Sequence, residues 1–299
     1  MIGRGAGELV VVPGPHDTLQ TLAARYLGDP ALYWQIADAN DIGGLSPERE
    51  VVVPLEPRNP TGVYENGYQV VPILNYHRFD RSGDRMAVRP DNFRRQLQHL
   101  AENDYRVVPL DHVLAFMRGT RVLPRRAVAI TIDDGFQSTY EVAYPLLVEF
   151  GYPATVFVYS DFVGRGGMGY AQLREMEGSG LIDIQAHSKT HANLTEQLPG
   201  ESQAAYRSRV EREIDEPAER LSRQIGDSIR HYAYPYGATN AYVMERLRHN
   251  GYDMGLTVAR GPNPFFAHPY ALRRSMVFSD RGMQGFVAAL QTFEQVPLQ

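Results

Sequence analysis

The chain contains no cysteine, which excludes disulfides, thiolate metal sites and cysteine nucleophiles. It also lacks any apolar run of about 18 residues, the length a helix needs to cross a membrane. Positive charge is not in excess: 30 Lys and Arg stand against 35 Asp and Glu, so the composition does not predict nucleic-acid binding. A metal bound by this chain would therefore need histidine and carboxylate ligands.

A length of 299 residues leaves room for one large domain and one small one. The first part reads as a strand at 9–12, helices at 19–26 and 31–39, and a strand at 50–54. A proline- and glycine-rich stretch follows it. We therefore expect a small βααβ domain at 1–57, a linker at 58–67 and a larger domain at 68–299.

This first part contains five short segments: Val12-Pro-Gly-Pro-His-Asp-Thr-Leu-Gln20, Leu22-Ala-Ala-Arg-Tyr-Leu27, Trp34-Gln-Ile-Ala37, Asn40 and Val52–Pro54. Together they resemble the motifs of LysM domains. The resemblance covers about residues 8–56 and implies a module that binds N-acetylglucosamine-containing chains such as peptidoglycan or chitin. By position, its binding groove would lie beside residues 13–18 and 41–46; the alternative is a small structural cap without a ligand.

Strand and helix patterns alternate along the rest of the chain. This alternation predicts an α/β fold with a parallel sheet, here a distorted (β/α) barrel of about seven units. The expected strands are 69–76, 106–110, 127–133, 154–159, 182–186, 231–234, 254–258 and 272–278. The expected helices are 90–102, 111–117, 138–150, 170–177, 202–225, 241–250 and 282–293.

The stretch Ala127-Val-Ala-Ile-Thr-Ile-Asp-Asp-Gly-Phe136 carries the first chemical signal. Its apolar run predicts a buried parallel strand, and ligands bind at the C-terminal ends of such strands. Asp133 and Asp134 would sit there, where paired carboxylates suit one metal ligand and one proton acceptor. The alternative is a helix N-cap beside a solvated neighbour.

Two further strand ends carry candidate residues. His187-Ser-Lys-Thr-His191 places two imidazoles four residues apart, close enough to reach one metal ion, or else to serve as surface or cap residues. In Tyr234-Pro-Tyr-Gly237, the turn could aim the Tyr236 N–H into a site as an oxyanion donor, or it could simply pack the barrel rim.

In this order, the three segments resemble the motifs of NodB-type polysaccharide deacetylases, carbohydrate esterase family four. The resemblance spans about residues 68–280. It implies that Asp133 is the general base, and that Asp134, His187 and His191 hold a divalent metal, with Zn²⁺ expected first and Co²⁺ or Ni²⁺ as alternatives. It further implies that Tyr236 supplies an oxyanion N–H and that Arg230 orients the base.

The chain departs from the family pattern at the general acid. The usual C-terminal Leu-x-His is not visible, and Leu272-Arg-Arg274 stands in roughly that region. Pro72-Ile-Leu-Asn-Tyr-His77 instead resembles the subgroup acting on poly-N-acetylglucosamine, which makes His77 the candidate acid. The alternatives are a structural role for His77 and His268 as the reserve acid.

The resemblance predicts an enzyme that removes N-acetyl groups from an N-acetylglucosamine-containing glycan. The rivals are a hydrolase of a different acyl substrate and a non-catalytic glycan-binding envelope protein. We expect action outside the cytoplasm, although residues 1–8 lack the apolar core of an export signal. The sequence does not predict the polymer or the oligomeric state.

Overall fold

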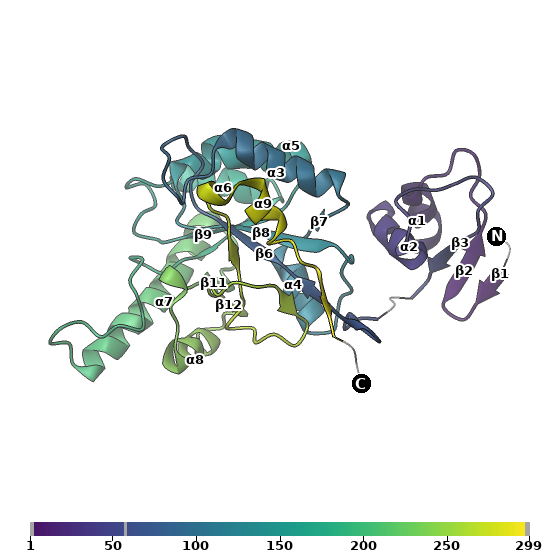
Figure 1. The fold of residues 1–299 in the computed structure, drawn as a ribbon. Coiled ribbons are helices and arrows are strands. Elements are labelled where there is room, and N and C mark those ends of the chain that lie inside the picture. Colours follow the sequence, from purple (N-terminus) through teal and green to yellow (C-terminus); the bar gives the residue numbers. More distant parts are fainter. Residues whose placement is uncertain (1–2, 57–58, 297–299) are drawn as a thin grey trace.

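The computed structural model describes residues 3–56 and 59–296. Figure 1 shows a small N-terminal unit beside a larger unit built around curled strands. No helix among the described residues is long and apolar enough to span a membrane.

The small unit is a three-stranded antiparallel sheet, ordered β1-β2-β3, with two helices packed on it. Its βααβ order agrees with the expectation from sequence. Strand β1 was not expected, because Gly-Arg-Gly offers no apolar alternation. The elements are β1 (Gly3–Gly5), β2 (Glu8–Val11), α1 (Leu19–Leu27), a 3₁₀ turn (Pro30–Leu32), α2 (Tyr33–Asn40) and β3 (Val51–Pro54).

Local chemistry fixes these elements. Thr18 caps α1 by accepting from the Thr21 N–H at 3.1 Å. Gly28 ends α1 in the left-handed conformation (φ 79°), which glycine adopts at little cost. The Asn40 side chain donates to the Val52 carbonyl at 2.7 Å and accepts from the Val52 N–H at 2.9 Å, which ties α2 to β3.

Side chains of the two units are in contact, and Arg125 pairs with Asp41 at 3.8 Å. Asp38 of α2 accepts the Arg125 N–H at 2.9 Å, and the Arg106 guanidinium lies 5.0 Å from the Tyr33 ring centroid. Within the stretch expected to be a linker, β4 (Val63–Tyr64) pairs with β5 (Gly67–Val71) of the larger unit.

The larger unit is built on one curled sheet with the strand order β12-β11-β10-β9-β8-β6-β14, and neighbouring strands are parallel. A parallel bridge between Leu256 and Leu272 brings the chain entering β14 back to β12. The expected distorted α/β barrel is therefore confirmed. Its strands are β6 (Ile73–Tyr76), β8 (Ala127–Ile132), β9 (Ala154–Val158), β10 (Ile182–Ala186), β11 (His231–Ala233), β12 (Met254–Leu256) and β14 (Ser275–Met276), with β7 (Arg106–Val107) beside β8.

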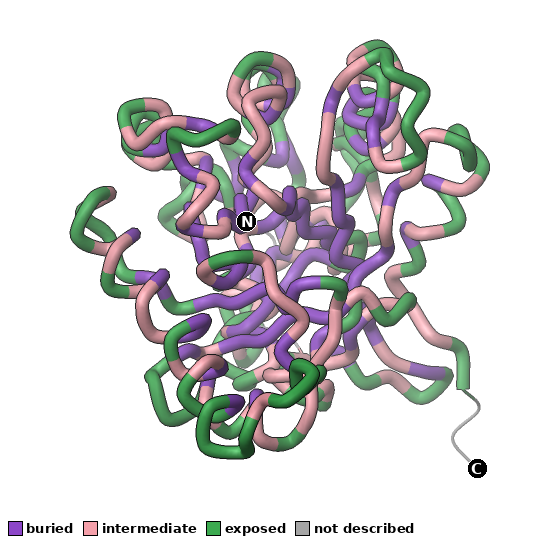
Figure 2. Tube along the Cα trace, turned by 90° about the vertical axis from the view of Figure 1, so that its left-hand side faces the viewer, coloured by how far each residue is buried: buried purple, intermediate pink, exposed green. Residues whose placement is uncertain are grey.

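Both faces of this sheet are buried, which explains why its strands read as continuous apolar runs. In β8, Val128, Ile130 and Ile132 belong to the hydrophobic cluster on one face of the sheet. Ala127 and Ala129 belong to the cluster on the other face. Figure 2 shows the buried stretches running through the centre, with exposed loops around them. The helices are α3 (Pro90–Glu102), α4 (Leu110–Met117), α5 (Tyr144–Phe150), α6 (Tyr170–Gly178), α7 (Gln203–Ile225), α8 (Ala241–His249) and α9 (Gly282–Val287).

Several expected elements differ in the structure. The strand expected at 106–110 is shorter, because β7 ends at Val107 and α4 already begins at Leu110. The strand expected at 69–76 is divided at Pro72, which has no N–H to donate: β5 joins a small antiparallel sheet and β6 enters the barrel. The last helix ends at Val287, and β15 (Phe293–Gln295) then pairs with β5. This pairing is between residues far apart in sequence, so local periodicity gave no sign of it.

Candidate active site

The three sequence motifs meet at one edge of the barrel. They follow the C-terminal ends of β8, β10 and β11, which lie in one sheet and run parallel. One carboxylate oxygen of Asp134 and one ring nitrogen each of His187 and His191 lie within 4.8 Å of one another. The structure therefore brings together the three residues predicted to hold a metal.

A backbone turn lets the adjacent carboxylates serve the same site. Strand β8 ends at Ile132, and Asp134 takes a positive φ of 76°, which is uncommon for residues other than glycine. Gly135 continues the turn (φ 78°), and a Cβ at this position would lie 2.7 Å from the Val158 side chain. Asp133 pairs with buried groups rather than capping a helix, so the N-cap alternative is wrong for it.

His187 is held in the orientation that a metal ligand needs. Its Nδ1 lies 2.7 Å from the Ala233 carbonyl oxygen, which can only accept, so Nδ1 carries the proton. In the neutral imidazole, the Nε2 lone pair is then free, and Nε2 lies 3.5 Å from Asp134 Oδ1. The Nε2 of His191 lies 3.3 Å from the same oxygen.

These residues fit a divalent metal. Asp134 Oδ1 is buried without a hydrogen-bond partner among the described residues, although it faces two ring nitrogens. Burial would raise the pKa of Asp134, but the nearby imidazoles outweigh it and the pKa falls far below its usual value, so the carboxylate is ionised. One carboxylate, two imidazoles and open positions form a set that Zn²⁺ and similar ions accept.

Asp133 is held by Arg274. Two guanidinium nitrogens reach its two carboxylate oxygens, both at 2.7 Å, and the Asn75 amide donates to Oδ2 at 3.1 Å. Arg274 is fully buried and Asp133 almost so. Burial would raise the pKa of Asp133, but the charges of Arg274 and His187 lower it, so the side chain is an ionised carboxylate.

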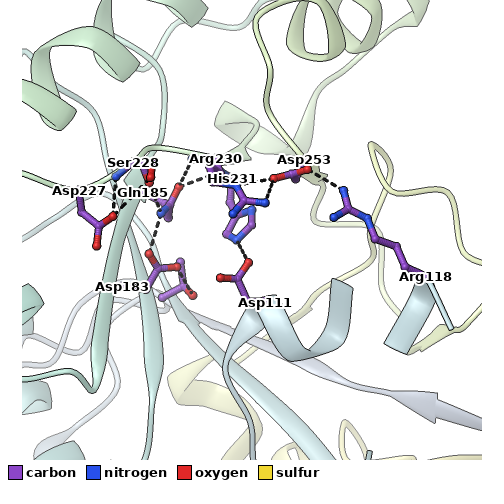
Figure 3. A network of polar contacts seen from close by, with 10 residues as sticks. Asp111, Arg118, Asp183, Gln185, Asp227, Ser228, Arg230, His231 and Asp253 are labelled. Atoms are coloured by element: carbon purple, nitrogen blue, oxygen red, sulfur yellow. Dashed lines mark hydrogen bonds and ion pairs between the residues drawn. The ribbon is translucent and has the colours of Figure 1, made fainter. Parts of the chain in front are cut away.

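Arg230 is not near this site, and its assignment as the arginine orienting the base is wrong. It lies just before β11, at the opposite end of the strand from Tyr234, and donates to Asp253 at 2.6 Å. Figure 3 shows it in a separate polar network with Arg118, Asp253 and His231. Arg274 occupies the position expected for Arg230.

His77 follows β6, next to β8 in the sheet, and is partly buried. Burial lowers its pKa; the carboxylates of Asp133 and Asp134 act in the opposite direction but do not cancel the effect. His268 is exposed, and its Nδ1 accepts the Tyr270 N–H at 3.2 Å, which places it in a surface loop.

Tyr236 stands on the turn that follows β11. Its φ is 59°, its side chain is exposed, and its ring centroid lies 4.7 Å from that of His191. Gly237 has a φ of 69°, and a Cβ there would lie 2.5 Å from the Val258 backbone nitrogen. The tight turn therefore depends on glycine and holds Tyr236 beside the metal-ligand set.

Sequence reasoning missed three residues around the site. Asn75 and Arg274 contact Asp133, and Glu213 contacts the loop between the two histidines. The available signal was Leu272-Arg-Arg274, where an arginine follows apolar residues in an expected strand. Charged residues are rarely buried unless they are paired, so such an arginine calls for a partner carboxylate.

The chain is similar to several known proteins. Residues 120–255 match the family model described as polysaccharide deacetylase. This chain is 28% identical over 233 residues to the poly-beta-1,6-N-acetyl-D-glucosamine N-deacetylase of Escherichia coli (strain K12). That match covers 66% of this chain and 34% of the relative. A protein of the same name from Staphylococcus epidermidis is 25% identical over 228 residues, covering 69% of this chain and 78% of its own length. Among solved structures, IcaB from Ammonifex degensii superposes with a TM-score of 0.65 and 27% identity, covering 76% of this chain and 98% of that one.

The chain therefore carries a polysaccharide deacetylase domain, and its barrel has the NodB-type fold. Asp133, Asp134, His187, His191 and Tyr236 all lie within the matched residues 120–255. The chain spans about a third of the length of the Escherichia coli relative, 34%.

Proposed function

We propose that this protein is a metal-dependent deacetylase that removes N-acetyl groups from an N-acetylglucosamine-containing polysaccharide. The observation that carries the proposal is that two adjacent carboxylates have different partners. Asp134 faces two histidines as a metal ligand would, while Arg274 holds Asp133 away from that set. Acetate release from N-acetylglucosamine oligomers, measured with and without a chelator, tests it.

The chemistry divides between these groups. A divalent ion held by Asp134, His187 and His191 would polarise the acetamide carbonyl and acidify a bound water. Asp133 stays ionised and is not a member of the metal-ligand set, so it can accept the proton of the attacking water as general base. Arg274 fixes the direction of that carboxylate through both of its oxygens.

Two more groups complete the proposal. The Tyr236 N–H, on the strained turn beside His191, would donate to the oxyanion. His77, close enough to Asp133 and Asp134 to feel both charges, would give a proton to the leaving nitrogen. Its lowered pKa means that the protonated form is lost at a lower pH than usual, so rates that need this acid should fall as pH rises through that pKa.

Replacing His77 by alanine should slow amide hydrolysis about 100-fold or more while sparing hydrolysis of an activated aryl acetate. A poor amine leaving group needs a proton, whereas a phenolate of low basicity does not. Steady-state kinetics on both substrates measure the difference. His268→Ala is the matched control and should change neither rate. Equal losses on both substrates in His77→Ala would remove His77 as the acid.

The substrate is proposed to be a polymer such as poly-N-acetylglucosamine, peptidoglycan or a chitin-like chain. The Escherichia coli and Staphylococcus epidermidis relatives are named for poly-beta-1,6-N-acetyl-D-glucosamine, which supports the first of these. Such polymers lie outside the cytoplasm, and we propose that the protein acts there. We propose Zn²⁺ as the metal, with Co²⁺ or Ni²⁺ as alternatives, since nitrogen and oxygen ligands suit all three.

We further propose that the small unit is a LysM-like glycan-binding domain spanning residues 1–57. It has its own buried core, which includes Leu22, Ile36 and Val53, so it is built as a separate module. A weak glycan site tethered to a catalytic site raises the local concentration of polymer at the second site.

Deleting residues 1–57 should therefore lower kcat/KM on a long polymer by about 10-fold or more, and leave kcat/KM on a short oligomer nearly unchanged. An oligomer too short to reach both sites gains nothing from the tether. The effect is measured by steady-state kinetics on the N-acetylglucosamine pentamer and on the polymer. The melting temperature of the truncated protein serves as a folding control. Equal losses on both substrates would mean that the domain is structural.

A further inference from the structure

Glu213 is a buried carboxylate that the chemistry above does not use. It lies on α7, the long helix packed against β10, and is only 4% exposed. Burying an ionised carboxylate is costly unless hydrogen bonds compensate for the lost water. The described residues show no ion pair for Glu213, so its compensation must come from donors of another kind.

Among the described residues, the Glu213 side chain accepts three hydrogen bonds, and all come from the loop between the two histidines. Its Oε2 accepts the N–H groups of Lys189 at 3.0 Å and Thr190 at 2.9 Å. Its Oε1 accepts the Thr190 hydroxyl at 2.6 Å. One carboxylate therefore holds the middle of the five-residue segment 187–191.

That loop needs an external support. It has neither helix nor strand structure, and both Ser188 (φ 70°) and His191 (φ 63°) take left-handed backbone conformations. Such conformations persist only where surrounding contacts impose them. Within the loop, Ser188 Oγ accepts the His191 N–H at 2.8 Å. The carbonyl oxygens of Ser188 and Lys189 accept the N–H groups of residues 160 and 161, at 3.1 and 2.9 Å, which anchors the first half of the loop. Thr190, which precedes His191, is held by the Glu213 carboxylate.

The two histidines differ in how the barrel fixes them. His187 is anchored directly. Its backbone N–H donates to the Val158 carbonyl at 2.9 Å, and its ring Nδ1–H donates to the Ala233 carbonyl. His191 has no comparable bond to a barrel strand among the described residues. Its position relative to Asp134 therefore depends on the loop, to which Glu213 contributes three hydrogen bonds at Lys189 and Thr190.

We propose that Glu213 is a positioning residue that places His191, through the loop backbone, for metal binding. The proposal rests on the metal site of the proposed function and adds that α7 is part of what builds it. Groups that support metal ligands in this indirect way typically change metal affinity about 10- to 100-fold when they are removed.

The neighbouring Glu216 offers a matched control. It lies almost one turn further along α7 and pairs with the Lys189 side chain, not with the loop backbone. Its side chain is 44% exposed, so the pair should contribute little. Glu216→Ala thus removes a contact between the same helix and the same loop without freeing the backbone.

The experiment measures the dissociation constant of Co²⁺ by competition with a chelator in the full chain, together with the visible absorption of the bound ion. Glu213→Ala should bind Co²⁺ about 10- to 100-fold more weakly, with an altered spectrum. Glu213→Gln should lose less, because its amide oxygen can accept the two backbone N–H groups and its NH₂ can donate to the Thr190 hydroxyl. Glu216→Ala should stay within about twofold of the wild type.

Wild-type affinity and spectrum in Glu213→Ala would overturn the proposal, as would an equal loss in Glu216→Ala. If Glu213→Ala does not fold, Glu213→Asp decides. Its carboxylate is one methylene shorter and cannot reach all three donors, so wild-type affinity there also overturns the proposal. Failure of the wild-type protein to bind Co²⁺ would instead contradict the metal site itself, which separates the two ideas.

Discussion

Asp133→Asn should lose about 100- to 10,000-fold in kcat while still binding its metal. The amide keeps the shape of the side chain but cannot accept the proton of the attacking water. Asp133 is outside the Asp134, His187 and His191 set, so metal content should not change. Acetate release gives the rate, and metal analysis of the purified protein gives the occupancy.

The same variant should also be less stable. It leaves Arg274 as a fully buried charge without its carboxylate, and breaking a buried pair in this way typically costs about 3–5 kcal/mol. Asp134→Asn is the control, because it alters a proposed metal ligand and should lower the metal content of the purified protein. Comparable turnover in Asp133→Asn and the wild type would show that the base is misassigned.

The second large effect is expected at Arg274. Arg274→Met removes both hydrogen bonds to the Asp133 carboxylate, leaves that charge buried, and should destabilise the fold by about 3–5 kcal/mol. It should also raise the pKa of Asp133, which Arg274 now holds below its usual value. The base is active when ionised, so the acid limb of the pH–rate profile should move to higher pH.

The pKa of Asp133 should also make the stability of the fold depend on pH. The lowered pKa of Asp133 contributes stability that is present above its unfolded value of about 3.9 and is lost as pH falls through the folded value. In Arg274→Met that contribution should shrink. Urea unfolding of both proteins at neutral pH and well below the unfolded value of about 3.9 measures the change.

Arg230→Ala is the control for Arg274. Arg230 is about half exposed and pairs with Asp253, so its loss should cost no more than about 1 kcal/mol and leave kcat unchanged. A large loss of turnover in Arg230→Ala, with normal turnover in Arg274→Met, would reverse the assignment made from the structure.

The barrel and the grouping of Asp134, His187 and His191 could be predicted because their signals are local. The apolar run ending at Asp133 marks a buried strand by itself, and His187 and His191 are separated by only three residues. Parallel strands then bring their C-terminal ends to the same edge, so adjacency in space followed from the fold class.

The support of the site could not be predicted in this way. Arg274 is 141 residues from Asp133, and Glu213 is 23 residues from Thr190 on a helix that otherwise reads as amphipathic. Arg230 directly precedes the strand that leads to Tyr234, but a residue at the start of a strand lies at the opposite end of the barrel from the site. The end of the strand at which a residue lies, and not its closeness in sequence, decides whether its charge reaches the site.

The most direct test of the account is acetate release from the N-acetylglucosamine pentamer by the full chain. It is measured as purified, after chelation, and after Zn²⁺, Co²⁺ or Ni²⁺ is added back. We expect release that stops with the chelator and returns with metal, because Asp134, His187 and His191 form the only such ligand group among the described residues. No release from protein shown to contain the metal would contradict the proposed activity on this glycan.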